Sequence, residues 1–153
     1  SHDTERILTT AKGDLQSVKS ALAFLYLQRG TPCIYYGTEL ALIGGPDPDC
    51  RRVMPWERVS AENDMLNFMK DLIQLRKEVA GMIQYGKVSL EEVEPDVVVV
   101  EWQYEAQILK AYFNQSKKDV VLERGQADLM SLGSISDDRL IIQPNGFVIY
   151  REN

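Results

Sequence analysis

Two stretches of the chain repeat apolar residues at the spacing of an amphipathic helix. The first follows Gly13, where Asp14 is placed to cap a helix start, and we expect this helix to run to about Arg29. Its apolar residues reach nearly all the way round, so we expect it to be buried on two sides, as between a sheet and other helices. They are Leu15, Val18, Ala21, Leu22, Phe24, Leu25 and Leu27.

The second helical pattern covers residues 63–79. Asn63 is placed to cap its start, and Arg76 and Lys77 fall in its last turn, where positive charge complements the helix dipole. Gly81 is expected to end it. The apolar positions, which we interpret as core, are Met65, Phe68, Met69, Leu72, Leu75 and Val79.

A short apolar run, Cys33-Ile34-Tyr35-Tyr36, lies between the two helices. Gly30 and Pro32 precede it and prevent the first helix from continuing. The run has no polar alternation, which is typical of a parallel strand buried on both faces. In a strand-helix barrel the strand ends face the active site, so Glu39 is either a site residue or the structural partner of an arginine, and we favour the structural role.

Beyond Gly86 the sequence changes to short β-prone runs separated by turn residues, which predicts an antiparallel sandwich. We therefore place a domain boundary near residue 83, with domains of residues 1–82 and 83–153. Pro144-Asn145-Gly146 indicates a tight turn. The expected strands are residues 88–93, 97–103, 107–114, 120–122, 140–143 and 146–151. The aromatic residues of this part are expected to pack in the core or in hairpins rather than to stack on a ligand; they are Trp102, Tyr104, Tyr112 and Tyr150.

Composition and charge limit the classes of molecule that this chain is expected to bind. The 153 residues are 44% hydrophobic and 26% charged, as in ordinary globular domains. A net charge of −6 argues against a nucleic-acid partner, which requires a basic face. No apolar run approaches the ~18 residues that span a bilayer, and no signal peptide opens the chain, so we expect no membrane partner and a cytoplasmic location.

The two cysteines are expected to be free thiols. Cys33 falls in the predicted buried strand and Cys50 in a predicted exposed loop, without the spacing of a metal-binding pair. With a single histidine in the chain, we expect no metal site and no cofactor.

Two polar clusters are candidates for ligand contact. The first, Ser1-His2-Asp3-Thr4-Glu5-Arg6, combines a histidine, a carboxylate and an arginine, which can give one ligand both donors and a negative charge, although it can also be a frayed, solvated end. The second is the loop that contains Asp47 and Arg51, in which prolines around Asp47 restrict the backbone. These two residues either bind a ligand or form an ion pair that holds the loop shut, and both roles can coexist.

In their order and spacing, the motifs SHDTER, GTPCIYYGTEL and GGPDPDCRR resemble the α-amylase family of glycoside hydrolases, and within it the cyclomaltodextrinase, neopullulanase and maltogenic amylase group. The resemblance covers the whole chain. It implies the last part of a (β/α)8 TIM barrel, with two helices, one strand and active-site loops, followed by an antiparallel β-sandwich domain. It also implies a C-terminal fragment, because the earlier barrel strands are missing. Pro46 replaces an asparagine that is common before the DPDC run.

The resemblance further implies retaining hydrolysis of α-1,4 bonds, with α-1,6 bonds as a second candidate, in cyclodextrins, maltooligosaccharides or related glucans. Asp3 matches the catalytic carboxylate that stabilises the transition state, and His2 would donate to a sugar hydroxyl. Asp47 and Arg51 would contact hydroxyls on the non-reducing side of the cleavage point. The nucleophile and the general acid would lie on earlier strands, so we expect the isolated chain to be inactive.

Two alternatives assign the function to the β-sandwich, either as a carbohydrate-binding module or as a structural or dimerisation module. The two apolar helices lack their natural partners in the chain, so we also expect exposed apolar surface and self-association into a homo-oligomer.

Overall fold

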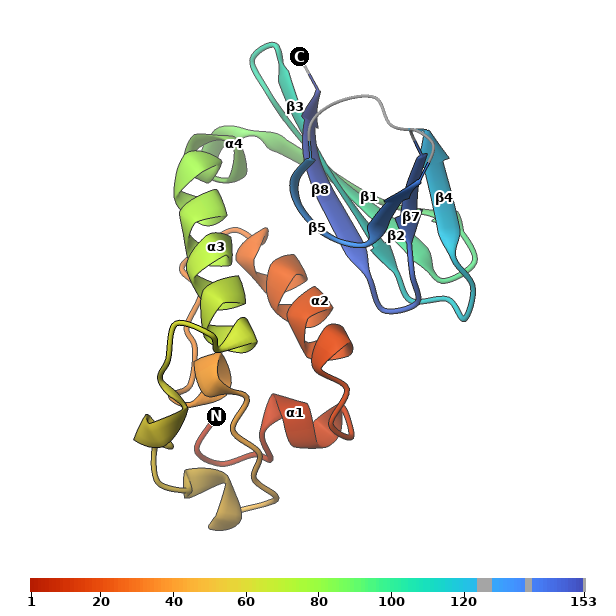
Figure 1. Cartoon of the computed structure of the whole chain (residues 1–153). Helices are drawn as coiled ribbons and strands as arrows, with labels where there is room; N and C mark the ends of the chain where they lie inside the picture. Colours follow the sequence, from red (N-terminus) through yellow and green to blue (C-terminus); the bar gives the residue numbers. More distant parts are fainter. Residues whose placement is uncertain (124–127, 137–138, 153) are drawn as a thin grey trace. The chain divides into compact units, whose positions relative to one another are not determined.

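The computed structural model of the chain describes residues 1–123, 128–136 and 139–152 (Figure 1). It divides into two compact units. The first unit consists of Ser1–Tyr26 and Thr31–Gln74, and the second of Leu27–Gly30 and Leu75–Asn153. The helix α3 (Asp64–Glu78) contributes residues to both units. The domain boundary near residue 83 stays a prediction.

The first unit is helical and packs its helices and loops around an apolar core. Its elements are α1 (Ile7–Thr10), α2 (Leu15–Tyr26), the short 3₁₀ helices η1 (Thr38–Leu40), η2 (Asp49–Arg51) and η3 (Trp56–Arg58), and the greater part of α3 (Asp64–Glu78). Its core residues include Val18, Leu22, Ala23, Leu40, Cys50, Met65, Met69 and Leu72.

Both predicted helix starts are confirmed. The Asp14 carboxylate accepts hydrogen bonds from the backbone N–H groups of Gln16 and Ser17, at 3.0 and 3.2 Å. The Asn63 side chain accepts one from the N–H of Leu66 at 2.9 Å. These caps satisfy N–H groups that have no acceptor within the helix.

The predicted helix ends are less accurate. α2 ends at Tyr26, before the expected Arg29, and α4 (Ala80–Tyr85) runs through Gly81, which was expected to stop helical structure. Glycine in a helix interior costs only about 1 kcal/mol, and burial of Met82 and Ile83 offsets that cost.

Residues 33–36 do not form the predicted strand. A β-strand requires a neighbouring strand for its backbone hydrogen bonds, and none pairs with this segment among the described residues. The expected burial of the cysteines is reversed: Cys33 is exposed, whereas Cys50 in the loop is fully buried. Both are free thiols.

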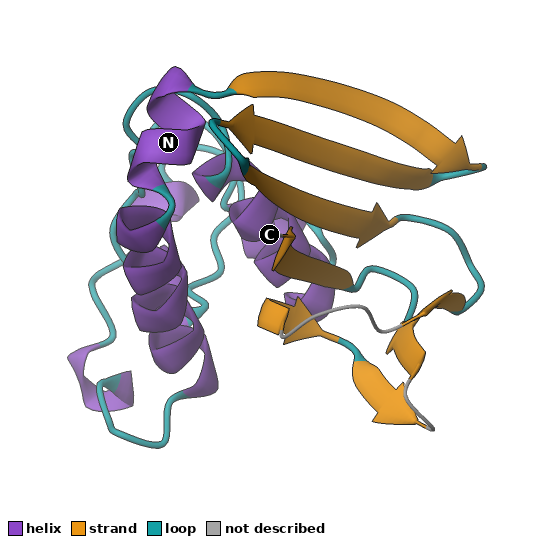
Figure 2. Cartoon of the chain, turned by 90° about the horizontal axis from the view of Figure 1, so that it is seen from above, coloured by secondary structure: helices purple, strands orange, loops and turns teal. Residues whose placement is uncertain are grey.

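The second unit contains two antiparallel sheets (Figure 2). The larger has the strand order β1-β2-β3-β8-β5 and the smaller β4-β7-β6. The strands are β1 (Lys87–Glu94), β2 (Val97–Tyr104), β3 (Gln107–Asn114), β4 (Val120–Glu123), β5 (Asp128–Leu132), β6 (Ser134–Ser136), β7 (Arg139–Ile142) and β8 (Phe147–Glu152). Each of the six predicted strands is present, and β5 and β6 were not predicted.

The two sheets share an apolar core, as a sandwich requires. Val97 and Val148 of the larger sheet cluster with residues of the smaller one, namely Val120, Leu140 and Ile142. The predicted tight turn precedes β8, with Asn145 at a φ of 60° and the N–H of Gly146 bonded to the carbonyl of Gln143 at 2.8 Å. The predicted sandwich is therefore confirmed.

Most aromatic residues of this unit pack as expected. Trp102 is 1% exposed, and the rings of Tyr112 and Tyr150 are stacked at 6.0 Å against the shared core. Burial, and then the hydrogen bond with Tyr112, raises the pKa of Tyr150. Tyr104 lies at the β2–β3 hairpin, which also agrees with the expectation, beside an exposed tyrosine, Tyr85.

Candidate functional site

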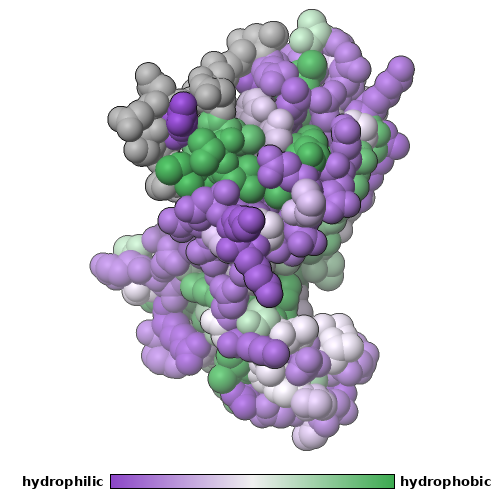
Figure 3. All heavy atoms as spheres, turned by 90° about the vertical axis from the view of Figure 1, so that its right-hand side faces the viewer, coloured by the Kyte–Doolittle hydropathy of each residue, from purple (hydrophilic) through white to green (hydrophobic). Residues whose placement is uncertain are grey.

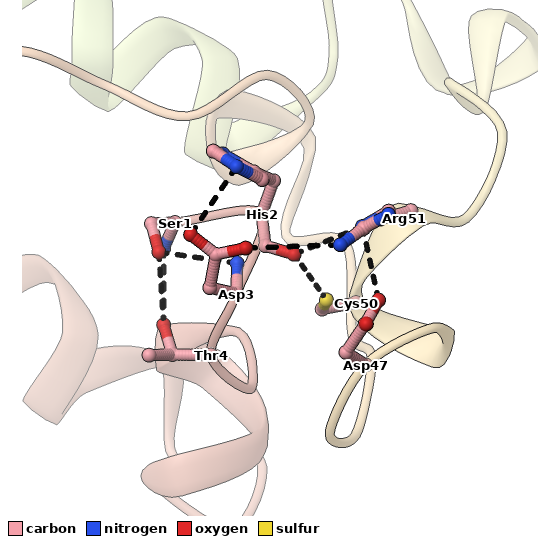
Figure 4. A network of polar contacts seen from close by, with 7 residues as sticks. All are labelled: Ser1, His2, Asp3, Thr4, Asp47, Cys50 and Arg51. Atoms are coloured by element: carbon pink, nitrogen blue, oxygen red, sulfur yellow. Dashed lines mark hydrogen bonds and ion pairs between the residues drawn. The ribbon is translucent and has the colours of Figure 1, made fainter.

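His2 and Asp3 lie in an N-terminal turn held by its own polar groups (Figure 4). The hydroxyl of Ser1 lies 3.5 Å from Thr4 Oγ1, and the N–H of Asp3 donates to Ser1 Oγ at 3.2 Å. His2 Nε2 lies 3.2 Å from Asp3 Oδ2. The two predicted site residues are therefore neighbours in space as well as in sequence, within a folded turn rather than a frayed end.

The proline-rich loop brings the other two predicted residues to this turn. Arg51 Nε lies 3.0 Å from Asp47 Oδ1 and also donates to the carbonyl oxygen of His2 at 3.0 Å. Arg51 Nη2 lies 3.7 Å from Asp3 Oδ1. All four residues predicted from sequence, which we call the polar cluster, thus form one connected network (Figure 4).

The polar cluster is open to solvent. The side chains of His2 and Asp3 are 66% and 65% exposed, and those of Asp47 and Arg51 are both 49% exposed. Exposed ion pairs contribute at most about 1 kcal/mol to stability, so the Asp47–Arg51 pair does little to hold the loop. Its carboxylate oxygens and guanidinium N–H groups are instead accessible acceptors and donors for a ligand.

A second ion pair lies within the same loop, and its side chains are 43% and 46% exposed. Arg52 binds Asp49 through two hydrogen bonds of 2.8 Å, and the N–H of Gly45 donates to the same carboxylate at 2.6 Å. The bond from Arg52, followed by the bond from Gly45, lowers the pKa of Asp49 below its usual value. The hydroxyl of Tyr36 donates to the carbonyl of Arg52 at 2.6 Å. Sequence reasoning missed this pair, although its i, i+3 spacing was a visible signal.

Close backbone packing also positions the loop. A Cβ on Gly44 would lie 2.7 Å from the carbonyl oxygen of Asp49 and 3.0 Å from the Cα of Cys50, so only glycine fits without displacement. The buried Cys50 thiol donates to the carbonyl of His2 at 3.1 Å. The peptide bond between Asp47 and Pro48 is cis. The Cys50 thiol thus joins the loop to the N-terminal turn, in addition to the bond that Arg51 donates to the same carbonyl.

Arg6 is a structural residue rather than part of the ligand-facing cluster. It is 3% exposed, and its Nη1 donates to the carbonyl of Tyr36 at 2.6 Å. Its guanidinium carbon lies 4.5 and 4.7 Å from the ring centroids of Tyr35 and Tyr36, and the backbone N–H of Arg6 donates to the carbonyl of Gly44 at 2.9 Å. The sequence interpretation that placed this arginine with His2 and Asp3 as a ligand donor is wrong, because its aromatic neighbours bury it.

Glu39 has no ion pair within the described part of the chain, so the expected arginine partner is not present there. It lines a pocket of about 350 Å³ together with Tyr26, Ile34, Tyr36, Leu66, Met69, Lys70 and Ile73. In residues 1–123, 128–136 and 139–152, no group of three or more histidine, cysteine, aspartate and glutamate side chains is arranged to hold a metal ion. Nor is any helix in those ranges long and apolar enough to cross a membrane.

Comparison with known families gives a match to the alpha-amylase catalytic domain over residues 1–77. The chain is 35% identical to the intracellular maltogenic amylase of Bacillus subtilis, covering 97% of this chain and 27% of that protein. It is 34% identical to the cyclomaltodextrinase of Thermoanaerobacter pseudethanolicus, covering 99% of this chain and 27% of that protein. The chain thus spans about a quarter of the length of these relatives.

Solved structures agree with the fold. The maltogenic amylase from S. marinus superimposes with a TM-score of 0.76 at 27% identity, over 97% of this chain and 21% of that one. The cyclic alpha-maltosyl-(1→6)-maltose hydrolase of Arthrobacter globiformis gives a TM-score of 0.80 at 24% identity, over 99% of this chain and 34% of that one. The helical unit and the sandwich thus occur together in these structures.

Proposed function

This chain belongs to the α-amylase family of glycoside hydrolases, and we propose that it supplies the C-terminal part of a retaining α-glucan hydrolase. Since the chain spans only about a quarter of the relatives it matches, the remaining barrel strands, with the nucleophile and the general acid, would come from other residues of the complete protein. The contribution of this chain would be the polar cluster.

In this proposal Asp3 is the catalytic carboxylate that faces the developing positive charge of the oxocarbenium-like transition state. A preorganised charge lowers the barrier because it requires no reorganisation during the reaction. Contacts of Asp3 with His2 and Arg51 support such an orientation. His2 would donate a hydrogen bond to a hydroxyl of the same sugar.

Asp47 and Arg51 would bind hydroxyls of the sugar on the non-reducing side of the cleaved bond. Their mutual contact at 3.0 Å presents an acceptor and a donor side by side, which matches the dual character of a hydroxyl group. Arg52 and the N–H of Gly45 donate to Asp49, so these donors do not occupy the carboxylate of Asp47.

The names of the relatives guide the choice of substrate. They are called maltogenic amylase, cyclomaltodextrinase and neopullulanase, which supports cyclodextrins, maltooligosaccharides or pullulan, and hence α-1,4 bonds with α-1,6 bonds as a second candidate. The B. subtilis relative is described as intracellular, which supports a cytoplasmic location.

One observation carries the proposal: the turn of Asp3 and the loop of Arg51, far apart in sequence, meet in one solvent-open cluster. The test is the substitution Asp3→Asn in the complete protein. We expect kcat on maltotriose or cyclodextrin to fall by at least ~10²-fold, because the change keeps the shape but removes the charge. Glu5→Gln, which alters a neighbouring exposed carboxylate that accepts from the Thr10 hydroxyl, is the matched control. Equal kcat for Asp3→Asn and the control would refute the role of Asp3.

A further inference from the structure

The peptide group between His2 and Asp3 is held by hydrogen bonds at both of its polar atoms. Its carbonyl oxygen, which belongs to His2, accepts from Cys50 Sγ at 3.1 Å and from Arg51 Nε at 3.0 Å. Its N–H, which belongs to Asp3, donates to Ser1 Oγ at 3.2 Å. Figure 4 shows these groups around the turn. Two consecutive residues of the proline-rich loop therefore share one acceptor next to Asp3.

The orientation of this peptide group affects the position of the Asp3 carboxylate. A peptide group is planar, so bonds that hold its carbonyl oxygen and its N–H also fix the direction in which the backbone enters Asp3. The Asp3 side chain is 65% exposed, and its contacts are with His2 and with the half-exposed Arg51. Such solvated contacts hold a side chain only weakly. The backbone is therefore the firmer of the two constraints on Asp3.

Of the three bonds to this peptide group, the bond from Cys50 is the one shielded from water. Cys50 is 0% exposed, whereas the side chain of Arg51 is 49% exposed and Ser1 is exposed. A thiol is a weak donor, but a hydrogen bond away from water is electrostatically stronger than one that water competes for. Backbone packing also holds Cys50 in place, since its Cα lies 3.0 Å from the position of a Cβ on Gly44.

The other donor of the loop, Arg51, has several partners. Its guanidinium lies 3.0 Å from Asp47 and 3.7 Å from Asp3, in addition to its bond to His2. In the proposed function the same N–H groups bind sugar hydroxyls, which compete with the carbonyl of His2. The buried thiol of Cys50 is out of reach of a ligand. Its bond would therefore be kept whether or not a substrate is bound.

We propose that Cys50 is a positioning residue for Asp3 and acts through the carbonyl oxygen of His2. This inference rests on the proposed function, in which Asp3 faces the developing positive charge. Stabilisation of a transition state depends on accurate placement of the charged group, so a small displacement lowers the rate. Loss of the thiol donor would let the peptide group reorient and lower kcat. It would leave Asp47 and Arg51, the proposed substrate-binding pair, in place.

Cys50→Ala and Cys50→Ser form a matched pair of variants in the complete protein. Alanine and serine leave a similar space in place of the sulfur, but only serine keeps a donor. We expect Cys50→Ala to lower kcat on maltotriose by roughly three- to tenfold with little change in KM, and Cys50→Ser to recover most of the loss. Cys33→Ala, which removes the exposed thiol, should keep the kcat of the unsubstituted protein. Equal kcat for Cys50→Ala and Cys50→Ser would overturn the positioning role, because lost volume affects both alike.

A second measurement does not depend on activity. A hydrogen bond to a carbonyl oxygen deshields the carbonyl carbon, so the ¹³C signal of the His2 carbonyl in the 153-residue chain should move upfield in Cys50→Ala. In Cys50→Ser it should return toward its original position. An unmoved signal in a folded Cys50→Ala chain would also overturn the inference, and the dispersion of the amide signals shows that the variant is folded.

Failure of the proposed function is distinguishable from failure of this inference. If Asp3→Asn leaves kcat unchanged in the complete protein, the proposed function is wrong. If Asp3→Asn lowers kcat but Cys50→Ala does not, the role of Asp3 stands and the positioning role of Cys50 is refuted.

Discussion

Arg51 donates a hydrogen bond of 3.0 Å to the backbone carbonyl of His2, across a sequence separation of 49 residues. The acceptor is a backbone atom, so the bond positions Arg51 independently of the conformation of the His2 side chain. Arg51 thereby links the proline-rich loop to the turn that carries Asp3. Substrate binding is expected to depend on this link.

Removal of the loop residues should weaken substrate binding in the complete protein. Asp47→Ala or Arg51→Ala leaves a substrate hydroxyl or the oppositely charged side chain without its partner. The free energy of substrate binding should become less favourable by about 1–3 kcal/mol. We expect the loss mainly in KM for maltotriose, with kcat less affected. Steady-state kinetics measure it, and an unchanged KM for both variants would mean that the pair is purely structural.

The isolated chain should not hydrolyse α-glucans. Asp3 stabilises charge only when a nucleophile and a general acid act on the same sugar, and these would come from other parts of the complete protein. Release of reducing sugar from maltooligosaccharides or cyclodextrin by the purified chain should equal that of its Asp3→Asn variant. Turnover by the unsubstituted chain that the variant lacks would show that this chain holds a complete active site.

The chain should self-associate in dilute buffer. Figure 3 shows apolar side chains exposed among hydrophilic ones on one face. The exposed large apolar residues of the first unit are Ile7, Leu25, Tyr36, Ile43, Val53, Trp56, Val59 and Ile73. Such exposure favours association, because burial of this surface against another copy removes it from water. Light scattering gives the mass, and a monomer that melts cooperatively would contradict the expectation.

The Asp49–Arg52 pair should make the loop sensitive to acid. The pKa of Asp49 is lower in the folded chain than its ordinary value of 3.8, so the pair stabilises the loop fully above that value. This contribution is lost as the pH falls through the lower, folded pKa. The amide proton of Gly45, which donates to Asp49, should report this titration in NMR spectra. Arg52→Gln should move the midpoint upward, and an unchanged midpoint would show that Arg52 does not lower the pKa.

Two glycines should respond oppositely to alanine. Gly44→Ala places a Cβ 2.7 Å from the carbonyl of Asp49, and the forced displacement should destabilise the chain by about 1–3 kcal/mol. Gly81→Ala in α4 meets nothing within 4 Å and should stabilise by up to about 1 kcal/mol, since alanine favours the helix. Thermal and urea unfolding compare the two, and equal stability of both variants would contradict the packing at Gly44.

Local signals in the sequence determined the elements with strong periodicity or turn chemistry. Asp14 and Asn63 indicated helix starts because each side-chain oxygen accepts a hydrogen bond from the backbone N–H three residues later. Such a contact depends only on nearby residues, so the sequence reveals it. Pro144-Asn145-Gly146 marked a hairpin for a similar local reason. The resemblance of the motifs to the α-amylase family likewise indicated the four residues of the polar cluster, without any information on the distances between their side chains.

Tertiary structure decided everything that depends on a distant partner. Residues 33–36 have the composition of a buried strand, but a strand exists only beside another strand. In the sequence Arg6 is placed to act as a ligand donor beside Asp3. In the structure the rings of Tyr35 and Tyr36 bury it. These rings are about 30 residues away, so no local sequence pattern predicts the contact. Lys87 and Gln103 likewise lie opposite each other only because of the register of β1 and β2, and the close approach at Gly86 depends on the same pairing.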